Sequence, residues 1–134
     1  MLLYLWIAAG SALGGVGRFA LSVFVADHYG DTFPWGTLLI NIAGSFAIGL
    51  FYTLTGSDGR WPVAHIGRQF FMVGVCGGFT TFSSFSLQTL LLARTGQWHK
   101  AGAYVAASVI LCLLGVWLGH LAAMLLNRAG TLPR

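Results

Sequence analysis

The stretch GGFTTFSSFS, residues 77–86, decides the fold. It lies in the middle of an apolar segment, roughly residues 69–93, which is long enough to cross a bilayer as a helix. Each of its two glycines costs a helix about 1 kcal/mol relative to alanine, and its hydroxyl groups compete for backbone partners. At membrane depth, the backbone groups freed by a break are tolerated only where they face protein, water or an ion. The stretch therefore predicts a spanning helix that is broken mid-membrane.

Three further apolar segments surround this one, at about residues 3–25, 35–55 and 101–126. Apart from Arg18, no segment contains Asp, Glu, Lys or Arg. The chain is 57% hydrophobic and only 7% charged, whereas soluble domains carry about 25% charged residues. We therefore predict an all-α integral membrane protein, in which residues 1–134 form a single four-span domain. The apolar stretch at residues 2–26 is too long for a typical signal peptide, so no cleaved segment is expected.

The basic residues are almost evenly divided between the two ends of the predicted bundle. Four spans place both termini on one side, with Arg60, Arg68, Arg128 and Arg134. The other side has Arg94 and Lys100, and also Arg18 if it is counted near the end of its span. Four against three is almost no positive-inside bias. This leaves two interpretations open: one orientation still dominates, or the chain inserts both ways and pairs antiparallel.

Composition also bears on the class of function. The net charge of +4 is spread thinly, without the clustered basic and aromatic residues that bind nucleic acid. Cys76 and Cys112 lie within apolar segments without metal-ligand spacing, and are interpreted as reduced core residues. No span holds a nucleophile with its base, so an enzyme is not expected. Glycine pairs at 10/14, 74/78 and 115/119 favour close helix packing.

Three sets of neutral polar residues lie at membrane depth, where polar groups are costly and tend to be functional. One face of the second span carries Thr37, Asn41 and Ser45; one face of the fourth carries Tyr104, Ser108 and Cys112; the third set includes Thr81, Ser83 and Ser84. Hydroxyls, amides and the positive edges of phenyl rings all favour an anion. Each set also has a structural interpretation: hydroxyls bonded to their own backbone, Asn41 joining two helices, and phenylalanines in ordinary packing.

The motifs resemble those of a known family. GTLLINIAG at residues 36–44 resembles the second-span signature of the Fluc fluoride channels, also called CrcB proteins. GGFTTFSSFS resembles their third-span signature, and GGVGR at residues 14–18 fits the first span. The likeness covers the whole chain in length, span count and motif order.

The resemblance implies a fluoride-selective passive channel in the cell (inner) membrane, which exports fluoride and protects against its toxicity. It implies an antiparallel, dual-topology homodimer with two anion pathways. Asn41 would donate to fluoride, and the rings of Phe82 and Phe85 would face the ion. Pathway-lining positions match Thr37, Tyr104 and Ser108, and Arg18 matches a basic residue near the aqueous vestibule. Snorkelling to headgroups is an equal alternative for Arg18. Backbone carbonyls of Gly77 and Thr80 would hold a structural sodium ion at the dimer interface.

Two positions depart from the family pattern. Gln88 stands where many relatives carry a glutamate near the pathway end, so this chain has an amide and no carboxylate at that position. Ser84 replaces a common threonine and keeps the hydroxyl.

Two other functions remain as alternatives. A small dual-topology multidrug exporter would need a carboxylate inside the membrane, and no predicted span contains one. His120 lies within a span, where a packed or interfacial histidine is the better interpretation. A non-transporting subunit of a membrane complex would use the small-residue faces to bind other helices.

Overall fold

The computed structural model describes residues 1–129. In this part of the chain, four helical segments are long and apolar enough to cross a membrane: Leu2–Tyr29, Trp35–Leu54, His65–Arg94 and Trp98–Ala129. The predicted all-helical, four-span architecture is confirmed for these residues. The chain is a multi-pass membrane protein. Arg134, which was counted in the charge balance above, lies outside the described residues.

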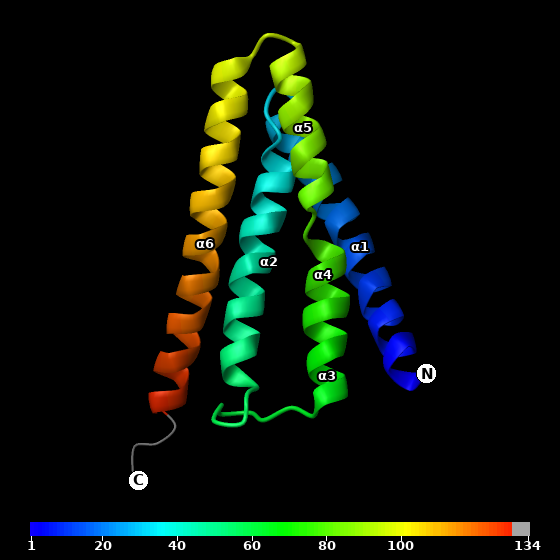
Figure 1. Cartoon of the computed structure of the whole chain (residues 1–134), viewed down its shortest axis with the longest axis vertical. Helices are drawn as coiled ribbons and strands as arrows, with labels where there is room; N and C mark the ends of the chain where they lie inside the picture. Colours follow the sequence, from blue (N-terminus) through cyan, green and yellow to red (C-terminus); the bar gives the residue numbers. More distant parts are fainter. Residues whose placement is uncertain (130–134) are drawn as a thin grey trace.

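The helices extend beyond the predicted apolar segments. α1 (Leu2–Tyr29) has 28 residues and α6 (Trp98–Ala129) has 32. At about 1.5 Å per residue, both are longer than the roughly 30 Å hydrocarbon core. Their ends therefore reach the interfaces, and polar residues such as Asp27 and Lys100 belong to the helices themselves. α1 begins and α6 ends at the same end of the molecule (Figure 1).

α2 (Trp35–Leu54) lies between α6 and the third span, and its contact with α6 is the most extensive in the molecule (Figure 1). Glycine makes this contact close. A Cβ on Gly119 would overlap the Phe46 carbonyl oxygen, and one on Gly49 would overlap the Val116 carbonyl oxygen. Backbones can approach in this way only where side chains are absent, which is the usual means of packing helices in lipid.

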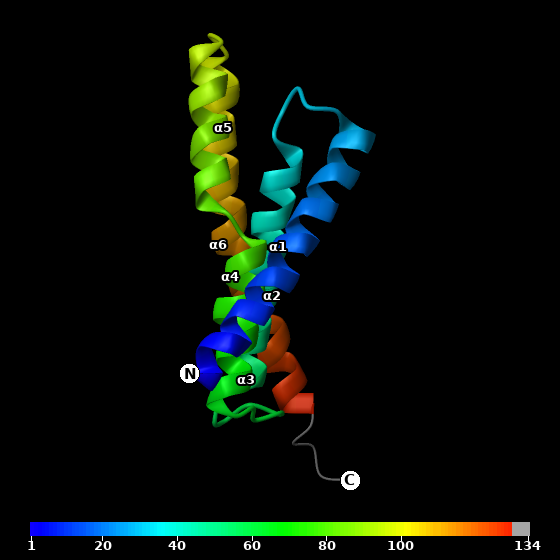
Figure 2. The same ribbon diagram turned by 90° about the vertical axis from the view of Figure 1, so that its right-hand side faces the viewer.

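α1 crosses the third span obliquely (Figure 2). Its Gly10 lies against Gly74, where an added Cβ would come within 3.0 Å of the Gly74 Cα atom. One turn later, a Cβ on Gly14 would overlap the Val75 carbonyl oxygen, and one on Gly78 would lie 2.6 Å from the Ser11 carbonyl oxygen. The close packing predicted from the glycine pairs is confirmed at both crossings.

The third span has several consecutive parts. α3 (His65–Gln69) continues into η1 (Phe70–Cys76), a seven-residue π-helix, and then into the short α4 (Gly77–Phe79). Thr80 and Thr81 follow with extended backbone dihedral angles, φ −78° and ψ 155° for the first and φ −151° and ψ 113° for the second. α5 (Phe82–Arg94) then resumes the helix. The interruption falls inside the GGFTTFSSFS stretch.

Candidate functional site

Asn41 supplies the hydrogen bonds that the extended backbone cannot make within a helix. Its Nδ2 donates to the Thr81 carbonyl at 3.1 Å, and the Thr81 N–H donates to its Oδ1 at 2.8 Å. Backbone groups left unpaired in an apolar environment are costly, so this pairing stabilises the interruption. One N–H of the Asn41 amide remains outside the pairing.

Thr81 also begins the helix that follows. Its Oγ1 accepts from the Ser84 N–H at 3.2 Å, the arrangement of a helix N-cap, and threonine is among the favoured residues there. The same oxygen lies 3.0 Å from Ser84 Oγ and 3.2 Å from Ser83 Oγ. The hydroxyls of Ser83 and Ser84 are therefore engaged locally at the start of α5.

The preceding helical segment ends against a basic side chain. α4 stops at Phe79, so the carbonyls of its last turn have no further helical N–H to bond. Arg18 Nε, which belongs to α1, donates to one of these oxygens, that of Gly78, at 3.3 Å. Arg18 thus lies at the third-span interruption, deeper than the span end where the charge count had placed it.

A cavity of about 440 Å³ opens beside the interruption; we call it the central cavity. Asn41 and Ser45 of α2, Phe82 and Phe85 of α5, and Ser108 and Cys112 of α6 line it, together with Gly77, Thr80 and Thr81. Its lining contains hydroxyls, an amide, thiols and aromatic rings, and no charged side chain. Such a lining can donate hydrogen bonds to an ion while leaving its charge unneutralised.

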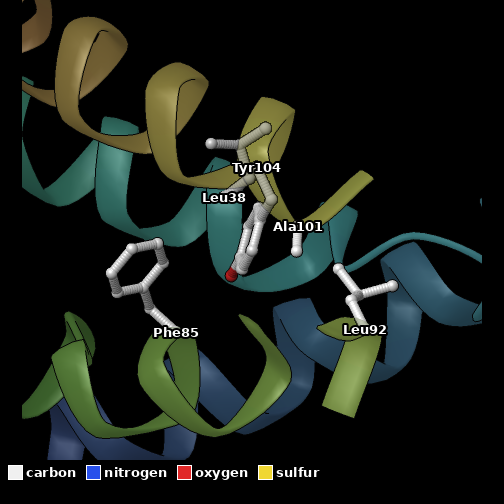
Figure 3. Close-up of a cluster of buried hydrophobic side chains, with 5 residues drawn as sticks. All are labelled: Leu38, Phe85, Leu92, Ala101 and Tyr104. Atoms are coloured by element: carbon white, nitrogen blue, oxygen red, sulfur yellow. The ribbon is translucent and has the colours of Figure 1, made fainter. Parts of the chain in front are cut away.

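The aromatic residues form a connected row. The ring centroids of Phe82 and Phe85 are 5.2 Å apart, and those of Phe85 and Tyr104 are also 5.2 Å apart. Figure 3 shows Phe85 and Tyr104 side by side among Leu38, Leu92 and Ala101. Tyr104 is 0% exposed, whereas Phe82 is 78% exposed. The row therefore runs from the interior of the bundle to its surface.

Ser108 lines the central cavity and has a buried hydroxyl without a hydrogen-bond partner in the described part of the chain. The residue is 7% exposed, and within residues 1–129 its Oγ has no hydrogen-bond partner. Hydroxyls in spans usually bond a carbonyl one turn back, as Thr80 Oγ1 bonds the Cys76 carbonyl at 2.9 Å. An unpaired buried hydroxyl costs free energy, so a hydrogen-bond partner that reached it would be stabilising.

A second cavity, of about 660 Å³, lies between the α1–α2 and α5–α6 connections; we call it the end cavity. Thr37 and Gln88 line it toward the membrane interior, and Asp31, Gln97 and Lys100 line it near the surface. Tyr104 stands between the two cavities, with its hydroxyl donating to Gln88 Oε1 at 2.9 Å. The polar face of α2 thus contributes to both linings: Thr37 lines the end cavity and Asn41 lines the central cavity.

The structure brings most of the predicted site residues together. Asn41, Thr81, Phe82, Phe85 and Ser108 share the central cavity, and Thr37 lines the end cavity. Tyr104 lines neither cavity but contacts Phe85 of the first and Gln88 of the second. Arg18, Ser83 and Ser84 line neither cavity. The roles assigned to these residues stay predictions.

Gln88 is the residue that the sequence interpretation undervalued. In the sequence it stands out only as a departure from the family pattern, yet its Oε1 accepts a hydrogen bond from the Tyr104 hydroxyl and the residue lines the end cavity. A sequence feature that could have identified Gln88 is its position: it is an uncharged amide near the end of a spanning segment, one turn after Phe85 on the same helix.

The fold and site together define a class: a polytopic helical membrane protein in which a row of uncharged hydrogen-bonding and aromatic side chains runs from the interior of the bundle to its surface. The chain belongs to the CrcB family. Residues 5–120 match the family described as "CrcB-like protein, Camphor Resistance (CrcB)".

Close relatives cover nearly all of the chain. A protein of Opitutus terrae is 65% identical over 127 residues, which are 95% of this chain and 96% of the relative. One of Paramagnetospirillum magneticum is 62% identical over 128 residues, covering 96% of this chain and 100% of the relative. One of Rhodospirillum rubrum is 61% identical over 124 residues, covering 92% and 96%. All three are named fluoride-specific ion channel FluC.

Proposed function

We propose that this protein is a passive channel that conducts fluoride out of the cytoplasm across the bacterial inner membrane. The observation that carries the proposal is the series of neutral donors and aromatic rings in two cavities, which Tyr104 links by its contacts with Phe85 of one lining and Gln88 of the other. The names of the relatives indicate that the conducted ion is fluoride. They agree with a lining that contains donors in both cavities and no carboxylate in the central one.

The pathway follows the polar faces of α2 and α6. Fluoride passes from the end cavity, at Thr37 and Gln88, to the Tyr104 hydroxyl, and then to Ser108 and the free N–H of Asn41. Except for the Tyr104 hydroxyl, whose proton bonds Gln88 Oε1, each group donates to the ion and so replaces part of its water shell, which is the general basis of selectivity in narrow pores. The edges of Phe82 and Phe85 carry partial positive charge and complete the lining.

The conducting unit in this proposal is an antiparallel homodimer with two pathways. Phe82 supports a partner at this face, because a ring that is 78% exposed on one copy is available to a second. The interruption at Thr80–Thr81 persists in the bilayer as a broken third span, stabilised by Asn41.

A structural sodium ion belongs to the same proposal. Carbonyl oxygens suit a hard cation. Gly77 and Thr80 line the central cavity where helical hydrogen bonding stops, so their carbonyls fit this requirement. The ion would join the interrupted segments of two copies at the dimer interface.

The direction of transport follows from the chemistry of fluoride. Neutral HF crosses membranes from acidic surroundings and ionises in neutral cytoplasm, where the anion is trapped. A pore returns fluoride down its own gradient, so the protein needs no energy source.

The direct test is fluoride release from liposomes that contain the purified protein, followed with a fluoride electrode. We expect release well above that of protein-free liposomes, and little release of chloride, which is larger and fits the donors poorly. Phe85→Ile, which keeps an apolar side chain and removes the ring edge, should lower the rate by about tenfold, or about 1.4 kcal/mol in the barrier. Wild-type liposomes that retain fluoride as protein-free ones do would refute the proposal.

A further inference from the structure

We infer that Arg60 and Arg68 form a binding surface for anionic phospholipids, in which each guanidinium holds the phosphate of one headgroup. The surface lies where the α2–α3 connection meets the end of α6, at the opposite end of the molecule from the end cavity (Figure 1). We call this end the basic end. Lipid binding here does not depend on the proposed conduction of fluoride.

The two ends of the molecule differ in net charge, with histidine counted as neutral. Within residues 1–129, three basic side chains stand against one carboxylate at the basic end: Arg60, Arg68 and Arg128 against Asp58. The opposite end has two of each: Arg94 and Lys100 against Asp27 and Asp31. An excess of positive charge near the membrane surface attracts anionic headgroups, so only the basic end should do so.

Both arginines of this surface are fixed by contacts with helix ends. Arg60 Nη1 donates to the Leu126 carbonyl, in the last turn of α6, at 3.1 Å. Arg68 Nη1 donates to the Tyr52 carbonyl at 3.3 Å and to Thr55 Oγ1 at 2.8 Å, at the end of α2. An arginine held in this way loses little conformational freedom when it binds a ligand, so more of the interaction energy appears as affinity.

The other edge of each guanidinium remains open. Arginine has five N–H donors, and in the described part of the chain Nε and Nη2 of Arg60 and Arg68 donate to no protein group. These two nitrogens form the planar fork that bonds two oxygens of one phosphate at the same time. Each side chain therefore has one edge anchored to protein and one edge suited to a phosphate.

Aromatic rings place these side chains at headgroup depth. Arg60 Cζ lies 5.4 Å from the centroid of the Trp61 ring, and Arg68 Cζ lies 5.1 Å from that of Tyr52. Both rings are exposed. Tryptophan and tyrosine gather at the boundary between hydrocarbon and headgroups, where lipid phosphates also lie. Acyl chains can then cover the rings while the phosphate meets the arginine, a combination that free phosphate cannot offer.

The first experiment counts the lipids that the purified protein retains in a neutral detergent, using native mass spectrometry. Phosphatidylglycerol should bind about tenfold more tightly than phosphatidylcholine, whose cationic group opposes the excess positive charge. Arg60→Gln and Arg68→Gln should each remove one retained phosphatidylglycerol from protein that elutes as wild type. Arg94→Gln is the matched control, because it removes the same charge at the opposite end. Equal losses in Arg94→Gln and Arg60→Gln would overturn the inference.

A charge-conserving variant separates the fork from charge alone. Arg60→Lys keeps the positive charge but cannot bond two oxygens from one plane, so its affinity for phosphatidylglycerol should fall about threefold. A lysine variant that binds as wild type would contradict the fork. Inorganic phosphate at the same concentration should leave the number of retained lipids unchanged. Displacement of phosphatidylglycerol by inorganic phosphate would show a site for the free anion instead of a lipid.

The second experiment uses the unsubstituted protein, so it does not depend on the folding of a variant. Phosphatidylglycerol with a photoreactive headgroup is mixed into phosphatidylcholine liposomes that contain the protein, and the labelled peptides are identified by mass spectrometry. Labels should concentrate in residues 52–68 and 126–129. Labels that concentrate in residues 27–37 and 94–100, or that divide equally between the two ends, would refute a lipid site at the basic end.

Discussion

At the scale of single residues, Asn41 has one role that the structure shows and one that is proposed. The sequence allows it to be either a donor to an ion or a link between helices. The structure shows the link: its amide pairs with both backbone groups of Thr81, 40 residues away. The proposed contact with fluoride uses the remaining N–H, so the ion site depends on the same side chain that holds the interruption in place.

We predict different losses for two substitutions of Asn41. Asn41→Ser is too short to bond both Thr81 groups, and each buried group left unpaired costs about 1–3 kcal/mol. Asn41→Asp keeps the acceptor but places a negative charge beside the Thr81 carbonyl and in the anion pathway. We therefore expect a lower Tm in detergent for both variants, and a lower fluoride rate for aspartate than for serine. Equal rates for the two variants would contradict the pathway role.

At the scale of elements, glycine determines how α1 meets the third span. Backbone atoms face Gly14 on this crossing, so no side chain can move aside to admit a larger residue. The contact positions Arg18, one turn later, against the Gly78 carbonyl. α1 therefore links the close helix packing at Gly14 to the hydrogen bond that Arg18 donates at the interruption.

A matched pair of substitutions tests this crossing. Gly14→Ala places a methyl group against the Val75 carbonyl oxygen and 2.7 Å from the Phe79 nitrogen. It should lower the Tm and the yield of folded protein, although alanine favours helix by about 1 kcal/mol over glycine. Gly15→Ala is the control, because a Cβ there meets nothing within 4 Å. We expect its Tm to match or exceed that of wild type, and an equally large fall in both variants would contradict the packing argument.

At the scale of the whole molecule, the distribution of charge gives orientation little support. Arg18 is bonded at the interruption, so it no longer counts with Arg94 and Lys100. Among residues 1–129, three basic side chains then stand at the end where α1 begins and two at the other. A difference of one charge is a weak orientation signal, which suits the proposed dual topology.

Topology can be measured with a cysteine added by Arg134→Cys and a membrane-impermeant thiol reagent. If the two copies are antiparallel, about half of the added thiols should react from each side of sealed vesicles, because dual insertion divides the termini equally. The unsubstituted chain reports the background from Cys76 and Cys112, which lie within the spans. Reaction from one side alone would exclude the antiparallel homodimer.

Some features could be predicted from sequence because they depend on local pattern. The four apolar segments predicted four spans, and spacing of four residues placed Thr37, Asn41 and Ser45 on one face. The ends were underestimated, since hydropathy falls where polar residues begin while helical hydrogen bonding continues. η1 was not predicted, because nothing in the period of its apolar residues distinguishes a π-helix from an α-helix.

The sequence by itself determined the number of spans, the faces that carry polar groups and the stretch where helix is unfavourable, since all three follow from neighbours along one helix. Only the tertiary structure decided which groups meet: Asn41 with Thr81, Tyr104 with Gln88, and Arg18 with Gly78. Such pairings depend on how each helix is rotated and how closely it packs, and the glycine contacts between helices set both.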